Sequence, residues 1–406
     1  MLQSQVIMKI LLVIIDGLGD RPISALGNKT PLEAAKTPNL DFFAKNGICG
    51  QVKPFLFPRE KTPTSEGAHI ALFGYQRYFL GRGPYEVAGI GMKMKKGDIA
   101  FRVNFATINS NLKIIDRRAG RISDTKSLIK SLSDITIDGI KFLVKESYGH
   151  RLGLIMRGKG LSMKISDGDP KKVGVKSKKI IPLNKSKQAK FTADVLNKFL
   201  NRTYEILKKH SLNKKRIKKG KLPANYLLIR GAGIYKESPS FKKKYNLKAC
   251  CIAGGGLYKG VAKILGMDII KVKGATGFAN TNLKGKFLAA KKAFKKYNFV
   301  FCHIKATDTF GHDGDFIGKK EFIEKTDKSL KSLLKLKNTL IVVTADHSTP
   351  CELKDHSADF IPFLIYKKNI KKSQVKEFSE KACRKGKLGK IKQTNLMKKI
   401  LTFTKI

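Results

Sequence analysis

The sequence predicts an α/β protein built on a mostly parallel sheet flanked by helices, and two observations carry this prediction. Continuous aliphatic runs at residues 9–15, 299–304 and 339–345 are typical of parallel strands buried on both faces. Each run is followed, at once or within a few residues, by an acidic side chain, and the last two runs also by an imidazole. In open parallel sheets, ligands bind at the carboxyl ends of the strands. We therefore expect a functional site at that edge of the sheet.

Length and composition exclude several classes of protein. The 406 residues suffice for one large core or two domains, and the hydrophobic content of 42% is ordinary for a globular chain. No apolar run reaches the roughly 20 residues that a membrane-spanning helix needs, so we expect no membrane partner. The apolar run before Asp16 lacks the flanks of a signal peptide and is interpreted as a strand. Residues 1–7 are expected to be a disordered tail, with Met8 as a candidate start.

The cysteines and the charge bear on location and partners. Six cysteines form no CxxC pair, which favours a reducing, cytoplasmic setting without disulfides.

The net charge of +52 raises the alternative of a nucleic-acid-binding protein. The lysines, however, are spread through almost every segment without interleaved aromatic residues, as in the runs 284–296 and 325–337. This favours a compositional bias and an anionic small-molecule partner over a nucleic-acid site.

The first quarter of the chain contains one strand end and three helix starts. The strand at 9–15 ends in Asp16, which is either a turn residue or a metal ligand or catalytic acid. Prolines bound a short helix within 30–38, and a second helix runs to residue 43 with Thr37 as its cap. The segment 63–74 enters a helix at Ser65, either a plain N-cap or a nucleophile beside a phosphoryl-binding helix N-terminus. On this segment alone the cap is favoured.

The middle of the chain changes character near residue 97. A glycine-rich segment at 81–91 is interpreted as a hinge, and an alternating strand at 98–108 carries Arg102 and Asn104. Three arginines gather at 116–121, His150 and Arg151 open a strand that reaches residue 156, and a turn at 167–170 holds two acids. Arginine clusters suit phosphate or carboxylate groups, and ordinary exposed basic residues are the alternative. A long amphipathic helix at 191–210 and a basic, linker-like run at 208–221 follow.

The α/β character returns after residue 225, with strands at 225–230, 250–253 and 361–366. Three glycines at 254–256 lead into a helix at 257–265, with Lys259 in its first turn. Glycines before a helix can cradle phosphate, but the pattern matches neither a Walker nor a GxGxxG motif, so this signal is weak.

The stretch KATDTFGHDGD at 305–315 is the centre of the predicted site. Asp308 and His312, four residues apart, can point at one cation if the backbone turns or enters a helix there. Acid and imidazole recur at Asp346, His347 and His356, again near strand ends. With Asp16 this makes ligands for two cations, as in two-metal phosphoryl transfer. Oxygen and imidazole ligands suit Mn²⁺, Zn²⁺ or Mg²⁺, and such a site would activate Ser65 as a nucleophile.

Taken in order, these segments resemble a known family. An Asp-Gly pair after the first strand is followed by TSEGAHIALFGY, ATDTFGHDGD, TADHSTP and a further His-Ser pair. This order is similar to that of the alkaline phosphatase superfamily. With GRGPYEVAGIG, FRVNFATIN, DRRAGRI and DGDP it resembles, more narrowly, the archaeal-type cofactor-independent phosphoglycerate mutases, from Met8 to about residue 366.

The resemblance implies an alkaline-phosphatase-like domain at 1–95 and 241–406, with a smaller substrate-binding α/β domain inserted at 96–240. It implies two divalent cations, with Mn²⁺ favoured and Mg²⁺, Zn²⁺ or Co²⁺ as alternatives, and no 2,3-bisphosphoglycerate. One metal would be bound by Asp308, His312 and His356, and the other by Asp16, Ser65, Asp346 and His347. Asp313 and Asp315 would have supporting roles. The phosphate and carboxylate groups of the substrate would be bound by Arg117, Arg118, His150, Arg151, Asp169 and Lys259.

The activity implied by the resemblance is interconversion of 3-phosphoglycerate and 2-phosphoglycerate, a glycolytic and gluconeogenic isomerisation, through phosphorylated Ser65. His150 and Asp169 would be candidates for the acid–base steps, and the segments 81–91 and 208–221 for hinges of domain closure. Another phosphohydrolase or phosphomutase of the superfamily, such as a phosphopentomutase, is the alternative. A nucleic-acid-binding protein ranks below it. The sequence gives no indication of oligomeric state.

Overall fold

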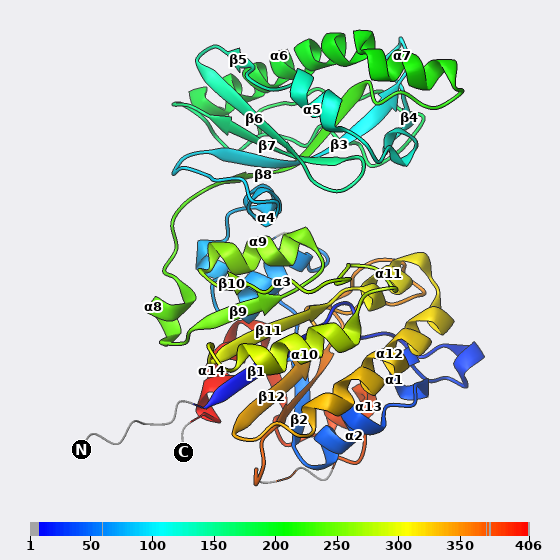
Figure 1. The fold of residues 1–406 in the computed structure, drawn as a ribbon, viewed down its shortest axis with the longest axis vertical. Coiled ribbons are helices and arrows are strands. Elements are labelled where there is room, and N and C mark those ends of the chain that lie inside the picture. The colour runs from blue at the N-terminus through cyan, green and yellow to red at the C-terminus, as the bar shows by residue number, and fades with distance from the viewer. Residues whose placement is uncertain (1–7, 59, 371, 373–374, 405–406) are drawn as a thin grey trace. The chain divides into compact units, whose positions relative to one another are not determined.

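The computed structural model describes residues 8–58, 60–370, 372 and 375–404, so the expected tail at 1–7 lies outside the described residues. The chain forms two compact units (Figure 1). Unit 1 comprises Met1–Phe79 and Pro239–Ile406, and unit 2 is the intervening Leu80–Ser238. Unit 2 begins at Leu80, earlier in the chain than the boundary expected near residue 95. The reason is that helix α4 (Arg82–Gly89) packs on strands of unit 2.

Unit 1 contains the mostly parallel sheet that the aliphatic runs predict, and the fold class is confirmed. Strand β1 (Lys9–Ile15) lies between β11 (Phe299–Ile304) and β12 (Thr339–Thr344), parallel to both and buried along six of its seven residues. Only β13 (Ile361–Tyr366) runs antiparallel to its neighbours in this sheet of the described chain. The remaining strands are β9 (Ala249–Ile252) and β10 (Asp268–Ile269) at one edge, and β2 (Ile48–Lys53) and β14 (Lys390–Lys392) at the other.

Helices cover this sheet, with α10 (Leu283–Ala293) packed on β11 and against α12 (Phe316–Leu330) (Figure 1). Thr30 and Glu33 form a capping box at the short helix α1 (Pro31–Ala34). Thr37 stands at the expected N-cap of the next helix, but its hydroxyl bonds Asp41 instead of a backbone N–H. The other helices of unit 1 are α2 (Pro38–Lys45), α3 (Ser65–Leu72), α8 (Phe241–Tyr245), α9 (Gly256–Ile264), α11 (Ala306–Asp313), α13 (Glu380–Arg384) and α14 (Leu396–Thr402).

Unit 2 is built on an antiparallel sheet around β3 (Ile99–Ile108), the alternating strand expected at 98–108. Strand β3 pairs with β7 (Arg151–Arg157), β8 (Tyr226–Ile234) and β4 (Ile114–Asp116). Strands β6 (Ile140–Glu146) and β5 (Thr136–Ile137) extend the sheet beyond β7. Its helices, besides α4, are α5 (Lys126–Ser131), α6 (Lys187–Lys209) and α7 (Ser211–Lys218).

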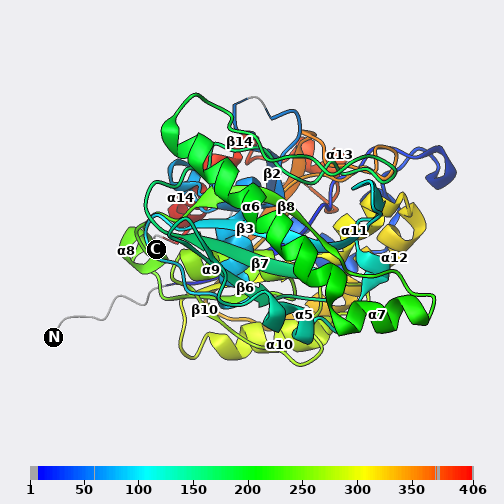
Figure 2. The same ribbon diagram turned by 90° about the horizontal axis from the view of Figure 1, so that it is seen from above.

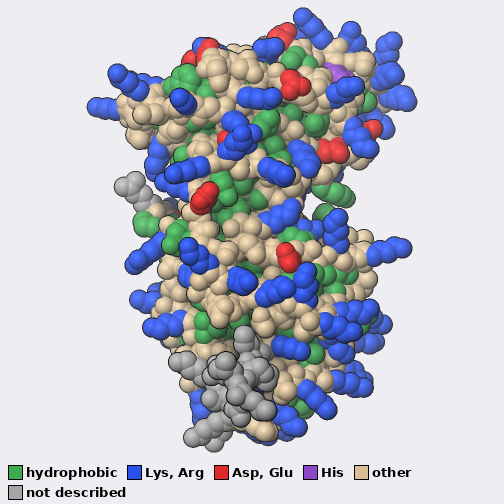
Figure 3. Space-filling model, turned by 60° about the vertical axis from the view of Figure 1, so that its left-hand side comes forward, with side chains coloured by type: hydrophobic (Ala, Val, Ile, Leu, Met, Phe, Trp, Pro, Cys, Tyr) green, Lys and Arg blue, Asp and Glu red, His purple; other side chains and the backbone are tan. Residues whose placement is uncertain are grey.

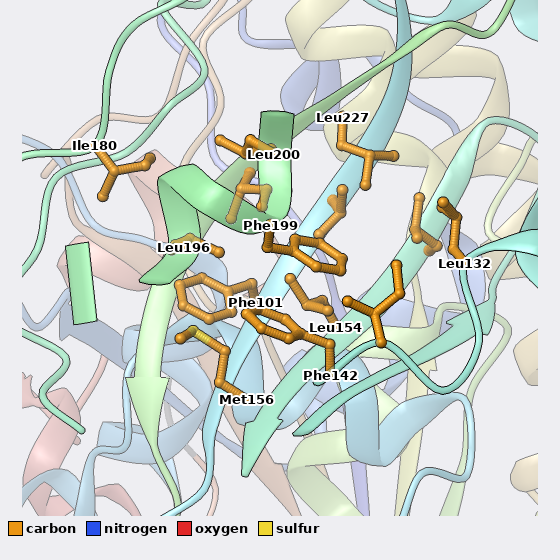
Figure 4. Close-up of a cluster of buried hydrophobic side chains, with 14 of the residues drawn as sticks. Phe101, Leu132, Phe142, Leu154, Met156, Ile180, Leu196, Phe199, Leu200 and Leu227 are labelled. Carbon is orange, nitrogen blue, oxygen red and sulfur yellow. The ribbon is translucent and has the colours of Figure 1, made fainter. Parts of the chain in front are cut away.

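The two faces of this sheet differ because side chains alternate along β3. Phe101, Val103 and their alternate neighbours point into a core covered by the long helix α6, which crosses the strands in Figure 2. Figure 4 shows this cluster, where the rings of Phe142 and Phe199 stack with centroids 4.0 Å apart. Arg102 and Asn104 have the opposite parity and belong to the face on which α4 packs.

Two segments differ from their sequence interpretation. The glycine-rich segment 81–91 is mostly the helix α4, in which a Cβ on Gly83 would lie only 1.9 Å from the carbonyl oxygen of Ala100. Gly83 therefore permits close packing on β3, and a hinge role for the segment stays a prediction. The basic run 208–221 is not a linker, because it contains α7. Asn213 fixes that turn by hydrogen bonds to the backbone of Leu207 and Ala224.

The six cysteines are all buried and free, as expected from their spacing. Among the described residues, no helix combines the length and the apolar character that crossing a bilayer requires. Lysine and arginine side chains are scattered over the face drawn in Figure 3 and form no single patch there. This distribution agrees with the interpretation of the +52 charge as a general bias of composition.

Candidate active site

The polar residues at the ends of three neighbouring strands come together in unit 1. Asp16 follows β1 directly, Asp346 and His347 follow β12, and Asp308 lies in the first turn of α11, which begins just after β11. Because β11, β1 and β12 are adjacent and parallel, their carboxyl ends meet at one edge of the sheet. The fold thus brings side chains from positions 16 to 356 into one cluster, in which the aspartates and His347 are buried while His356 is part-buried and His312 is exposed.

The first group of candidate ligands is Asp308, His312 and His356. The helix α11 places Asp308 and His312 on one face, with Nε2 of His312 3.6 Å from Oδ1 of Asp308. Nε2 of His356 lies 3.3 Å from the same oxygen. Nδ1 of each imidazole donates to a backbone carbonyl, that of Lys354 at 2.9 Å and that of Pro63 at 2.7 Å. These bonds leave each Nε2 as the other, acceptor nitrogen, and the two Nε2 atoms lie 3.2 Å apart beside the carboxylate of Asp308.

The second group is Asp16, Asp308 and His347, so that Asp308 belongs to both groups. Nε2 of His347 lies 3.7 Å from Oδ1 of Asp16 and 3.1 Å from Oδ2 of Asp346. Burial lowers the pKa of His347, but the carboxylates of Asp346, Asp16 and Asp308 outweigh it and raise the value to about 9. Thr349 connects the two groups, because its hydroxyl donates to Oδ1 of Asp308 at 2.8 Å and lies 3.2 Å from Nδ1 of His347.

Ser65 is not the cap of its helix, and the cap interpretation is wrong. Thr64 is the N-cap of α3, and its hydroxyl accepts from the backbone N–H of Gly67 at 3.3 Å. Ser65 is the first residue inside the helix and is only 6% exposed. Its Oγ lies 3.3 Å from Nε2 of His347. A hydroxyl that has no capping role and lies against the candidate ligands is placed as a nucleophile would be.

Most of the predicted substrate-binding residues lie in unit 2, near the face of the sheet that α6 does not cover. Arg117 donates two hydrogen bonds to Asp169, at 3.0 and 2.7 Å. Arg151 pairs in register with Asn104 across the β3–β7 ladder. Burial, followed by the charges of Arg151 and Arg118, lowers the pKa of the adjacent His150 to about 4. Arg118 is exposed at the start of the turn that follows β4.

Three further arginines belong to this group, although the sequence did not single them out for binding. Arg102 on β3 and Arg230 on β8 are direct cross-strand partners. Nε of Arg82 and Nη1 of Arg102 lie 3.0 and 3.4 Å from Oε1 of Glu86. Burial, together with the charges of Arg82, Arg230 and Arg151, lowers the pKa of Arg102 to about 9 despite the attraction of Glu86. Like charges facing each other are unfavourable, so this arrangement is suited to an added anion.

Comparisons with known proteins agree with this geometry. A family model described as the Metalloenzyme superfamily matches residues 8–402. Over 403 residues, the chain is 47% identical to 2,3-bisphosphoglycerate-independent phosphoglycerate mutase 1 of Methanocaldococcus jannaschii, covering 98% of this chain and 97% of the relative. The similarly named protein of Archaeoglobus fulgidus is 46% identical over 399 residues, or 96% of each chain. The chain belongs to the 2,3-bisphosphoglycerate-independent phosphoglycerate mutases.

Solved structures place the fold in the same mutase family. The cofactor-independent phosphoglycerate mutase from Thermoplasma acidophilum has a TM-score of 0.71 at 34% identity, covering 98% of this chain and 100% of that one. A Pyrococcus horikoshii protein has a TM-score of 0.84 at 34% identity, covering 98% and 97% of the two chains.

The clustered residues of this mutase fit a divalent cation. Oδ1 of Asp16 is buried and has no hydrogen-bond partner within the described part of the chain, whereas Oδ2 of Asp346 faces the imidazoles of His347 and His69 at 3.1 and 3.5 Å. An unpaired carboxylate oxygen is costly to bury unless a cation neutralises it. Carboxylate oxygen with imidazole nitrogen is a donor set for Mn²⁺, Mg²⁺ or Zn²⁺. Membership of a metalloenzyme superfamily and this donor set together support dependence on a divalent metal.

Several residues that support the mutase site were missed in the sequence. Tyr258, His303 and Lys305 surround Asp16, and His69 lies 3.5 Å from Oδ2 of Asp346. His303 and His69 sit inside predicted core segments, where imidazole is commonly structural, so no signal distinguished them. Lys305 opens the central 305–315 stretch, and that position was the only available signal. Lys259 lies in α9 of unit 1, next to Tyr258, and burial lowers its pKa.

Proposed function

We propose that this chain interconverts 3-phosphoglycerate and 2-phosphoglycerate without 2,3-bisphosphoglycerate, with Ser65 carrying the phosphoryl group between the two positions. The observation that carries the proposal is the placement of Ser65. A buried hydroxyl at the start of α3 lies 3.3 Å from His347, within a cluster of carboxylates and imidazoles suited to metal binding. That combination supports phosphoryl transfer through a serine intermediate.

Two divalent cations are proposed, with Mn²⁺ preferred over Mg²⁺, Zn²⁺ and Co²⁺. Asp308, His312 and His356 would hold one, and Asp16, Ser65, Asp346 and His347 the other, with Asp308 also close enough to Asp16 and His347 to contribute to the second. When bound, such cations would favour the deprotonated hydroxyl and neutralise charge on the phosphoryl oxygens. The protein prepares this chemistry by keeping ligand atoms such as Oδ1 of Asp16 free of hydrogen bonds from the described residues.

The reaction is proposed as two transfers at Ser65. In the first, Oγ of Ser65 forms a bond to phosphorus and gives up its proton, while the bond between phosphorus and the 3-oxygen of the substrate breaks and that oxygen takes up a proton. This gives phosphoserine and glycerate. In the second, the 2-hydroxyl of the same glycerate gives its proton to a base and bonds to phosphorus, while the bond to Oγ breaks and Oγ takes up a proton. Water must be excluded between the two steps, since hydrolysis of phosphoserine would convert the mutase into a phosphatase.

Unit 2 is proposed to bind the charged groups of the substrate. Arg102, Arg117, Arg151 and Arg230 offer planar guanidinium groups that suit phosphate and carboxylate, and Arg118 adds positive charge. Lys259, in α9 of unit 1, is proposed separately as an anion-binding residue. For proton transfer, His150 and Asp169 are both candidates. Burial and nearby arginines lower the pKa of His150 to about 4, so its imidazole is unprotonated at pH 7 but only weakly basic. Burial raises the pKa of Asp169, but the two bonds from Arg117 outweigh it and keep the carboxylate weakly basic.

The experiment that tests this proposal identifies the products. Metal-loaded protein is incubated with 3-phosphoglycerate, without 2,3-bisphosphoglycerate, and followed by ³¹P NMR. We expect the 2-phosphoglycerate signal to grow to equilibrium with little inorganic phosphate. Release of phosphate alone would identify a hydrolase of the superfamily. Turnover of a phosphopentose, with none of phosphoglycerate, would identify the other alternative.

A further inference from the structure

The two oxygens of the Asp16 carboxylate have different surroundings. The hydroxyl of Tyr258 donates to Oδ2, Nε2 of His303 lies 3.1 Å from it, and Nζ of Lys305 lies 3.3 Å away. Oδ1, in contrast, has no hydrogen-bond partner in the described chain and is the oxygen that faces His347. Three groups therefore gather at one oxygen while the other is left for a cation.

Tyr258 is built into this position by the residues around it. Its ring stacks on the ring of His303 with centroids 3.4 Å apart, and the side chain is almost fully buried. A phenol hydroxyl carries its proton at neutral pH, so it can donate a hydrogen bond to the carboxylate.

One of the three glycines before Tyr258, Gly255, makes room for the ring of that tyrosine. A Cβ on Gly255 would lie 2.8 and 2.9 Å from the Cδ2 and Cε2 atoms of the Tyr258 ring, closer than real contacts allow. The backbone of Gly255 has φ −73° and ψ 140°, which any residue can adopt. A larger residue at position 255 would collide with the Tyr258 ring, so glycine is needed there to leave room for the ring. At Gly256, a Cβ would meet nothing within 4 Å.

We propose that Tyr258 is a positioning residue for the metal ligand Asp16. By holding Oδ2, its hydroxyl fixes the rotation of the carboxylate and presents Oδ1 alone to the metal. Hydrogen bonds to the non-ligating atom of a ligand orient it, and their loss typically costs about 10- to 100-fold in metal affinity. This inference rests on the proposed metal centre and assigns a role to the segment 254–258 that substrate binding does not require.

The test compares two tyrosines that each donate to an aspartate. Tyr258→Phe removes only the hydroxyl at the site. Tyr297→Phe is the matched control, because the hydroxyl of Tyr297 donates to Oδ2 of Asp268 at 2.7 Å, at the edge strand β10 of the same unit. Full-length protein stripped with EDTA is titrated with Mn²⁺ by calorimetry. We expect Tyr258→Phe to weaken one of two sites about 10- to 100-fold. The other site, and both sites of Tyr297→Phe, should keep the affinity of the wild type.

A second pair of variants keeps the hydroxyl and moves the ring. Gly255→Ala should displace Tyr258 and weaken the same Mn²⁺ site, whereas Gly256→Ala should leave affinity unchanged. The visible spectrum of bound Co²⁺ should change in Tyr258→Phe and Gly255→Ala alone. Unchanged affinity in both, or equal loss in the controls, would overturn the inference. A wild type that binds no Mn²⁺ and shows no mutase activity would instead refute the proposed function.

Discussion

Oγ of Ser65 lies 3.3 Å from Nε2 of His347, although 282 positions separate the two residues in the chain. One begins the helix α3 and the other follows the strand β12. The proposed nucleophile is therefore in contact with a proposed metal ligand. Oγ of Ser65 and Nε2 of His347 would both take part in binding the cation that activates the hydroxyl.

Removing the hydroxyl should abolish catalysis without unfolding the protein. We expect Ser65→Ala to lose at least about 10³-fold in mutase activity, as loss of a nucleophile does. Ser186→Ala is the control, because Ser186 caps α6 through the N–H of Ala189. It should cost about 1 kcal/mol in the free energy of unfolding and leave activity unchanged. Activity within tenfold of wild type in Ser65→Ala would reject the nucleophile assignment.

Three substitutions in the 305–315 stretch should separate the two metal sites. Asp308 belongs to both ligand groups, so Asp308→Asn should weaken both. His312→Gln should affect only one of them. Asp315→Asn is the control, because Oδ1 of Asp315 accepts from the N–H of Gly318 to cap α12, and asparagine caps equally well. Metal content after dialysis against Mn²⁺ measures the outcome; full occupancy in Asp308→Asn would contradict the shared-ligand geometry.

The arginines of unit 2 should differ in their effect on substrate binding. Arg102→Lys keeps the positive charge but loses the planar guanidinium that can donate two hydrogen bonds to one anion. A hydrogen bond to a charged group contributes about 1.5–3 kcal/mol, so we expect KM to rise roughly 10-fold or more. Arg157→Lys is the control, since Arg157 pairs with Asp98 at 2.7 Å away from the arginine group. It should lower thermal stability at unchanged KM. Equal KM values in both variants would show that Arg102 does not contact the substrate.

His150 should titrate far below its usual pKa. Burial and the charges of Arg151 and Arg118 lower the value to about 4, which proton NMR can measure in the metal-free protein. The unfolded chain takes up this proton near pH 6.5, whereas the folded chain takes it up only near pH 4. As pH falls from 6.5 to 4, protonation of His150 therefore favours the unfolded chain and lowers the free energy of unfolding. His150→Gln should remove this part of the pH dependence. A midpoint near 6.5 would show that the imidazole is solvated.

The sequence allowed prediction of those elements whose signal is local. The aliphatic run 9–15 is β1 residue for residue, because a strand buried on both faces needs no polar alternation. Asp308 and His312 could be paired because their spacing fits one helix face. The hydroxyl of Ser65 could not be assigned between cap and nucleophile, since both roles require the same residue type at a helix start. In the structure the N-cap of α3 is Thr64, one position before Ser65, so Ser65 has no capping role.

Other parts of the site depend on contacts between distant segments. The pairing of Arg102 with Arg230 follows from the register of β3 and β8, which alternation alone does not determine. The glycines at 254–256 were interpreted through their possible effect on phosphate, whereas at Gly255 the limiting contact is the ring of Tyr258. The basic run 208–221 suggested a linker by composition, and it became helical through the bonds of Asn213 to Leu207 and Ala224.

The most direct test of the central claim is a coupled assay of 3-phosphoglycerate conversion without 2,3-bisphosphoglycerate. Protein stripped with EDTA is assayed before and after addition of Mn²⁺, beside the Ser65→Ala variant treated in the same way. We predict no turnover in the stripped protein, full restoration by Mn²⁺ in the wild type, and none in Ser65→Ala. Formation of 2-phosphoglycerate that needs added bisphosphoglycerate, or that persists equally in Ser65→Ala, would contradict the account.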